Sequence, residues 1–101
     1  MLTKEKVLEQ LGNVHDPELG MSITDLGLVY RVEIFEDKKV EVDFTLTYPG
    51  CPAADIIYQD IEFTLQNNEE ISDSKINIVW DPPWSIEKMS DEAKISLGYP
   101  V

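Results

Sequence analysis

The chain has 101 residues, 43% of them hydrophobic, and its 20 acidic and 8 basic residues give a formal net charge of −12. This length predicts one domain spanning residues 1–101. The acidic balance argues against binding to a nucleic-acid backbone and favours proteins or cations as partners. No apolar run approaches the roughly 18 residues that span a bilayer, so no membrane association is expected. A single cysteine cannot form an internal disulfide, which favours a cytoplasmic location.

The first third of the chain is expected to form a helix, a loop and a short turn. Thr3 can cap a helix whose apolar face is formed by Val7, Leu8 and Leu11. Residues 13–20 are predicted to form a loop because they contain an Asp-Pro pair and a glycine. Residues 22–25 are typical of a single capped turn.

Alternating apolar residues then predict two strands, over 28–35 and 40–47, joined by a charged turn at 36–39. A helix is predicted over 52–67, where apolar residues recur at helical spacing, followed by a third strand over 75–80. Ser90 can cap a last short helix that ends at Gly98. The order α-β-β-α-β-α predicts an α+β fold, a two-layer sandwich with a small mixed sheet covered by helices on one face.

The stretch 45–54 leaves the second strand, turns at Pro49 and Gly50, and places Cys51 before Pro52. Proline is favoured at the first helical position, so Cys51 is expected at or beside the helix N-cap. The positive end of a helix dipole lowers the pKa of a thiol there and favours the thiolate that binds metals or attacks electrophiles. Strand parity places Thr47 on the side of this loop. The alternative is that Cys51 is a small buried residue that closes the turn.

Five stretches together resemble the iron–sulfur cluster assembly domain family that was long known as domain of unknown function 59, which includes SufT and PaaD proteins. They keep the order and spacing of the family's motifs and cover the chain from about Val14 to Gly98. The stretches are residues 16–19, 22–29, 45–52, 79–84 and 89–94. Having one cysteine, the chain departs from the PaaD-type members, which carry extra C-terminal cysteines.

The resemblance implies a fold like the C-terminal domain of NifU-type scaffolds and a role in maturing iron–sulfur proteins as a carrier or adaptor, not as an enzyme. It places the functional cysteine and metal ligand at Cys51, the acidic motif at Asp16 and Glu18, and a supporting threonine at Thr47. It also places the C-terminal motif at Trp80, Asp81, Pro82, Pro83 and Trp84, a stiff ridge that a partner could bind or that could simply pack. Asp16 and Glu18 could be oxygen ligands, groups that tune the thiol, or caps of a turn.

One cysteine cannot supply the four thiolates that a cluster normally needs. A cluster or iron would therefore be held transiently, with none tightly bound, be completed by oxygen, nitrogen or thiol ligands from elsewhere, or be shared across a homodimer. The implied partners are the iron–sulfur assembly machinery and client apoproteins. Two alternatives stay open: a thiol enzyme in which Cys51 is the nucleophile, His15 the base and Asp16 its orienting group, and a purely structural interaction module.

Overall fold

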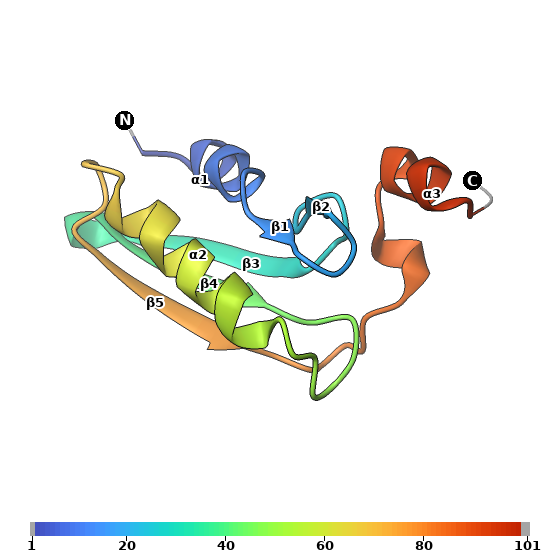
Figure 1. Cartoon of the computed structure of the whole chain (residues 1–101). Helices are drawn as coiled ribbons and strands as arrows, with labels where there is room; N and C mark the ends of the chain where they lie inside the picture. Colours follow the sequence, from blue (N-terminus) through green and yellow to red (C-terminus); the bar gives the residue numbers. More distant parts are fainter. Residues whose placement is uncertain (1, 100–101) are drawn as a thin grey trace.

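The computed structural model describes residues 2–99 and contains three α-helices, five strands and two short 3₁₀ turns within that range (Figure 1). In chain order they are α1 (Lys4–Leu11), β1 (His15–Asp16), β2 (Met21–Ser22), β3 (Val29–Phe35), η1 (Glu36–Lys38), β4 (Lys39–Phe44), α2 (Ala54–Gln66), β5 (Asp73–Ile78), η2 (Ile86–Lys88) and α3 (Asp91–Leu97). None of the described helices is long and apolar enough to cross a membrane.

The central sheet has the strand order β3-β4-β5, in which β3 and β4 form an antiparallel hairpin and β5 runs parallel to β4. Helix α2 connects the two parallel strands. It lies with α1 over one face of the sheet, whereas α3 lies beyond the sheet's end (Figure 1). The predicted α+β fold with a mixed sheet is confirmed.

The core lies between the sheet and the two helices. Val40, Val42 and Phe44 alternate along β4 with partly exposed residues, and Ile57, Ile61 and Leu65 form the buried stripe of α2. Both spacings match the periods that the sequence shows, two residues for a strand and three to four for a helix. The prediction was wrong for Leu8, which is 39% exposed although Val7 and Leu11 beside it are fully buried.

Capping residues lie at the ends of α1 and α3, the first and last helices. The Thr3 hydroxyl accepts a hydrogen bond from the backbone N–H of Lys6, and the Ser90 hydroxyl accepts one from Ala93. Gly98 ends α3 at a φ of 85°, in the left-handed region that glycine adopts without strain. These three cap predictions are confirmed.

Two features differ from the expected elements. Residues within the expected loop 13–20 extend into a two-stranded ladder with Met21 and Ser22, in which His15 pairs with Ser22 and Asp16 with Met21. The segment after Trp84 forms the short turn η2. Runs of two or three residues are too short to show a hydrophobic period, so the pattern of the sequence could not reveal either one.

Candidate functional site

The Cys51 loop connects β4 to α2 and closes around a glycine. Gly50 has a φ of 83°, which glycine adopts at little cost, and the chain then places Cys51 in the protein with 4% of its surface exposed. The Cys51 carbonyl accepts a hydrogen bond from Ala54 N–H at 3.1 Å. Helix α2 begins at Ala54 with Ala53 as its N-cap, so the expectation that Pro52 begins the helix was wrong.

The thiol of Cys51 contacts the acidic motif. Its Sγ donates a hydrogen bond to Oε1 of Glu18 at 3.0 Å. Burial raises the pKa of the Cys51 thiol, and the hydrogen bond to Glu18 and the negative charges of Glu18 and Asp16 raise it further. The backbone N–H of Ala53 acts in the opposite direction but does not offset them. The expected lowering of the thiol pKa by the helix was therefore wrong, because desolvation and a carboxylate outweigh the helix terminus.

Asp16 holds the turn that carries Glu18. Its side chain is buried, with 1% of the residue exposed, and its Oδ1 accepts the backbone N–H of Glu18 at 2.8 Å. The Asp16 carbonyl accepts the N–H of Gly20 at 2.7 Å. Asp16 thus caps the turn of the β1–β2 connection so that the Glu18 side chain reaches Cys51, and turn capping is one of the three roles that the sequence left open.

Tyr48 is a member of this cluster that the sequence analysis missed. Its hydroxyl donates to the two carboxylate oxygens of Glu18 at 3.4 and 3.5 Å, while its ring is half exposed. The pKa of Tyr48 is raised, first by partial desolvation and then by the charge of Glu18. The sequence feature that could have indicated its role is its position inside the motif, three residues before Cys51.

The threonines before the loop differ in their environments. Thr47, predicted to support the loop, is partly buried. Thr45 is fully buried, and its Oγ1 has no hydrogen-bond partner in the described part of the chain.

The structure does not assemble the Cys-His-Asp arrangement of a thiol enzyme. His15 and Asp16 are neighbours in the extended strand β1, where consecutive side chains point to opposite sides. Asp16 is buried, whereas His15 is exposed and its Nδ1 lies 3.0 Å from the carbonyl oxygen of Asn13. In this geometry His15 faces away from the cluster around Cys51.

The same cluster offers few ligands to a metal. Within residues 2–99, no group of three or more His, Cys, Asp or Glu side chains is arranged to hold a metal ion. Cys51 and Glu18 supply one soft sulfur ligand and one hard oxygen ligand, side by side. A cluster or iron ion bound here as cargo would need further ligands from another molecule.

The ridge 80–84 has one exposed and one anchored tryptophan. Trp80 is 45% exposed, whereas Trp84 is partly buried and its Nε1 donates to the carbonyl of Leu26 at 2.7 Å. The Asp81–Pro82 peptide bond is cis, and the Pro82 carbonyl accepts the Tyr30 hydroxyl at 2.8 Å.

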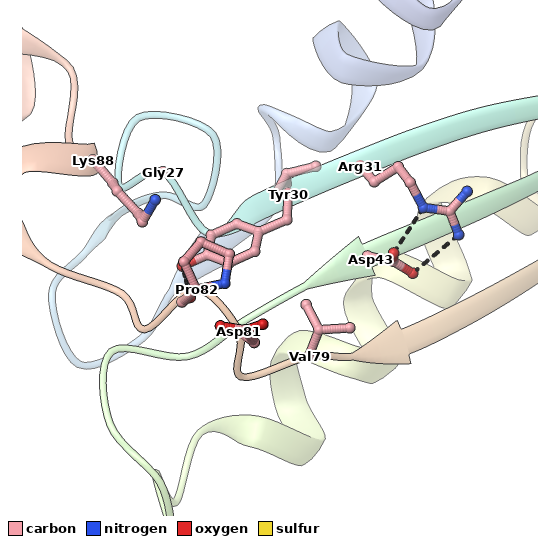
Figure 2. A pocket seen from close by; sticks show the side chains of 9 residues that line it. Gly27, Tyr30, Arg31, Asp43, Val79, Asp81, Pro82 and Lys88 are labelled. Carbon is pink, nitrogen blue, oxygen red and sulfur yellow. Dashed lines mark hydrogen bonds and ion pairs between the residues drawn. The ribbon is translucent and has the colours of Figure 1, made fainter.

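Figure 2 shows this segment at a hollow of about 560 Å³. Tyr30 lies against Pro82, with Lys88 Nζ 5.0 Å from the centre of its ring, whereas Arg31 and Asp43 lie at the end of the hollow away from Lys88. The remaining lining residues are Gly27, Val29, Val79 and Asp81. Cys51 does not line this hollow.

Comparisons with known proteins agree with the resemblance seen in the motifs. Residues 4–78 match the family model described as iron-sulfur cluster assembly protein. The chain is 46% identical to the Fe-S protein maturation auxiliary factor YitW of Bacillus subtilis, over 94% of this chain and 93% of that protein. It is 47% identical to the Fe-S protein maturation auxiliary factor SufT of Staphylococcus aureus, over 84% and 97% of the two chains.

A solved structure from Bacillus anthracis, described as a domain of unknown function, superposes with a TM-score of 0.91 at 43% identity and covers 96% of this chain and 92% of its own. Its fold is that of the sheet and helices in Figure 1. The family match over 75 residues, together with these relatives, decides the assignment. The chain belongs to the iron–sulfur cluster assembly protein family.

Proposed function

We propose that this protein is a maturation factor for iron–sulfur proteins, and that Cys51 is the group that takes up an iron–sulfur cluster or iron as transient cargo. The proposal is supported by one geometric observation: the chain's single thiol lies 3.0 Å from a carboxylate that a separate loop brings to it. A buried thiol closing a turn needs no such partner. The auxiliary maturation role in the names of the relatives points the same way.

The cluster residues have distinct tasks in this proposal. Cys51 supplies the soft ligand, Glu18 accepts the thiol proton and can supply an oxygen ligand, and Asp16 holds Glu18 in place. Binding of the cargo replaces the thiol proton, since only the thiolate is a metal ligand. Thr47 supports the loop. Because one thiolate and one carboxylate hold a cluster weakly, the cargo passes readily to a client apoprotein.

The remaining parts of the proposal follow from this division. The protein acts as a carrier or adaptor in the cytoplasm, without turnover of a substrate, and meets both the assembly machinery and client apoproteins. The ridge formed by Trp80, Asp81, Pro82, Pro83 and Trp84 serves these contacts through its exposed part. Two copies could share a cluster by contributing one Cys51 each.

Anaerobic reconstitution with iron and sulfide tests the ligand role. Wild-type protein is expected to develop the visible sulfur-to-iron charge-transfer absorption, and Cys51→Ser is expected to lose it while keeping its circular dichroism spectrum and thermal unfolding. Wild-type protein alkylated with iodoacetamide is a matched control, because it keeps the sequence and blocks only the thiol. Equal absorption in all three samples would overturn the ligand role of Cys51 and leave an adaptor role alone.

A further inference from the structure

Strand β5 presents a free edge. It is the last strand in the order β3-β4-β5 and pairs only with β4 among the described strands. Just past its end, Val79 N–H donates to the carbonyl of Phe44 at 2.9 Å, so Val79 turns its backbone groups towards β4. Because these groups alternate along a strand, Ile76 and Ile78 turn their N–H and C=O groups to the free edge.

The free edge is blocked at the start of β5 and available for pairing with another strand at its end. At its start, the N–H of Ser74 is satisfied by Oδ1 of Asp73 at 2.9 Å, a local bond that blocks pairing there. At its end, the large apolar side chains of Ile78 and Trp80 are 40% and 45% exposed. Exposed apolar side chains next to unpaired backbone groups are the features that an added strand uses for affinity and specificity.

This open edge lies at the same end of the molecule as Cys51. Strands β4 and β5 are parallel and α2 connects them, so the last residues of both strands and the first turn of α2 share one end of the sheet (Figure 1). Cys51 lies three residues before the first residue of α2. A segment paired with β5 would therefore run towards the loop that carries the thiol.

Charge on the flanking helix decides which kind of segment fits. Glu62 of α2 lines a hollow of about 370 Å³ with Ser72, Asp73 and Ser74, so this side of the helix borders β5. Asp55 is seven residues earlier and lies on the same side of α2. Carboxylates thus border the edge of a chain whose net charge is −12, and a basic segment is complementary to it.

A second copy of the chain is a poor occupant of this edge. Two β5 strands paired antiparallel would bring the Asp55 and Glu62 sides of the two copies together, where like charges repel. The same pairing places the two carboxyl ends of β5, and with them the two Cys51 loops, at opposite ends of the joined sheet. The two thiols could not then share one cluster.

We propose that the free edge of β5 at Ile76 and Ile78 binds an extended segment of a client protein as an added β-strand, with the segment's basic and apolar side chains at every second position, on the face that is turned to α2. This inference rests on the proposed function, because it supplies the contact that holds a client beside the thiol. Apolar side chains of the segment pack against Ile78 and Trp80, and basic side chains face Asp55 and Glu62.

Titration of ¹⁵N-labelled protein with two capped hexapeptides tests the inference. Both have threonine at every second position and valine in the middle of the remaining three; the two positions on either side of this valine are lysine in one peptide and glutamate in the other. The lysine peptide is expected to shift the amide signals of Ile76, Ile78 and Trp80, and the glutamate peptide to bind at least about fivefold more weakly. Shifts confined to other surfaces, equal binding of both peptides, or growth of a dimer through β5 in place of peptide binding would each overturn the inference.

Variants separate the charge contribution from the backbone contribution. Asp55→Lys and Glu62→Lys are each expected to weaken the lysine peptide about two- to fivefold, whereas Asp60→Lys, the same change on the other side of α2, leaves binding unchanged. Ile78→Pro removes an edge N–H and is expected to bind roughly two- to tenfold more weakly than Ile78→Ala, which keeps it. If Ile78→Pro does not fold, N-methylation of alternate peptide residues removes the same hydrogen bonds on the peptide side.

The outcome is independent of cluster uptake. Cys51→Ser is expected to bind the lysine peptide as well as the wild type does, although it loses the charge-transfer absorption. Peptide binding that fails while wild-type reconstitution succeeds would overturn only the edge inference. Reconstitution that fails while the peptide binds would overturn only the ligand role of Cys51.

Discussion

Two acidic clusters in this protein differ in how their charges are balanced. On the sheet face opposite the helices, Arg31 lies between Asp43 and Glu41, at 2.8 and 3.2 Å. The side-chain amide of Asn77 donates to both carboxylates, at 2.8 and 2.7 Å. In the other cluster, within the described chain, Glu18 receives only the Cys51 thiol and the long hydrogen bonds from Tyr48.

The two clusters differ in whether the partners of their carboxylates can be replaced by a bound cation. The sheet-face cluster is held by three paired strands, and its carboxylates already have a cation and amide donors. Among the described residues no cation contacts the Glu18 carboxylate, and its closest donor is a thiol whose proton a cationic cargo can replace. Charge balance on the rigid strands serves stability, while the unbalanced charge on loops is where chemistry can take place.

The largest expected effect is on stability, when Asp16, which holds the turn that carries Glu18, is replaced. Asp16→Ala leaves the N–H of Glu18 without its acceptor, and we expect the free energy of unfolding to fall by about 1–3 kcal/mol. Chemical denaturation measures this loss. Asp16→Asn keeps an oxygen acceptor and should lose less. If both variants lost the same amount, the charge of Asp16, and not its capping bond, would be what matters.

Removal of the charge beside the thiol should have a smaller effect, on reactivity alone. Glu18→Gln is expected to lower the pKa of Cys51 and to raise the rate of alkylation by iodoacetamide near pH 7 roughly three- to tenfold. Burial, the larger cause of the raised pKa, remains in the variant, so the pKa should stay above that of a free thiol.

The sheet-face cluster provides the control for that measurement. Asp43→Asn changes a carboxylate to an amide just as Glu18→Gln does, but on the strands, and it should leave the alkylation rate of Cys51 unchanged. An equal acceleration in both variants would mean that overall charge, and not contact with Glu18, sets the reactivity of the thiol.

The sequence predicted the fold correctly wherever a hydrophobic period extends over enough residues to distinguish a strand from a helix. Six residues of β4 and thirteen of α2 show their buried faces plainly, and the parallel pairing of β4 and β5 follows from the helix between them. The capping residues Thr3 and Ser90 were found because a hydroxyl before a helix has a local reason to be there.

The sequence could not determine the chemistry of the thiol. The motifs indicated that Asp16, Glu18 and Cys51 belong together, but not that Glu18 contacts the sulfur while Asp16 holds the turn. The direction in which the pKa of the thiol shifts depends on burial and on a carboxylate 33 residues away. The local sequence around a helix start reveals neither of these. Tyr48 was missed for the same reason, because its role exists only once the two loops meet.

The smallest expected effect is the pH dependence of the sheet-face cluster. The hydrogen bond from Arg31 lowers the pKa of Asp43 below its ordinary value, and the bond from Asn77 acts in the same direction. A carboxyl whose pKa is lower in the folded state adds stability at pH values above its unfolded pKa, about 3.9, and this stability is lost as the pH falls through the folded value.

Substitution of Arg31→Leu should therefore lower the melting temperature by about 1–5 °C at pH 7, as expected for a partly exposed ion pair. The difference from wild type should shrink as the pH falls below about 4 and through the lowered pKa of Asp43, at which the wild-type carboxyl also becomes protonated. Thermal unfolding at a series of pH values measures this, and 0.5 M salt should reduce the difference at pH 7 because exposed charges are screened. A difference that stayed constant from pH 7 to pH 3 would show that Arg31 stabilises the sheet by packing its aliphatic stem. In that case the contrast with the Cys51 cluster would rest on strand rigidity and not on charge balance.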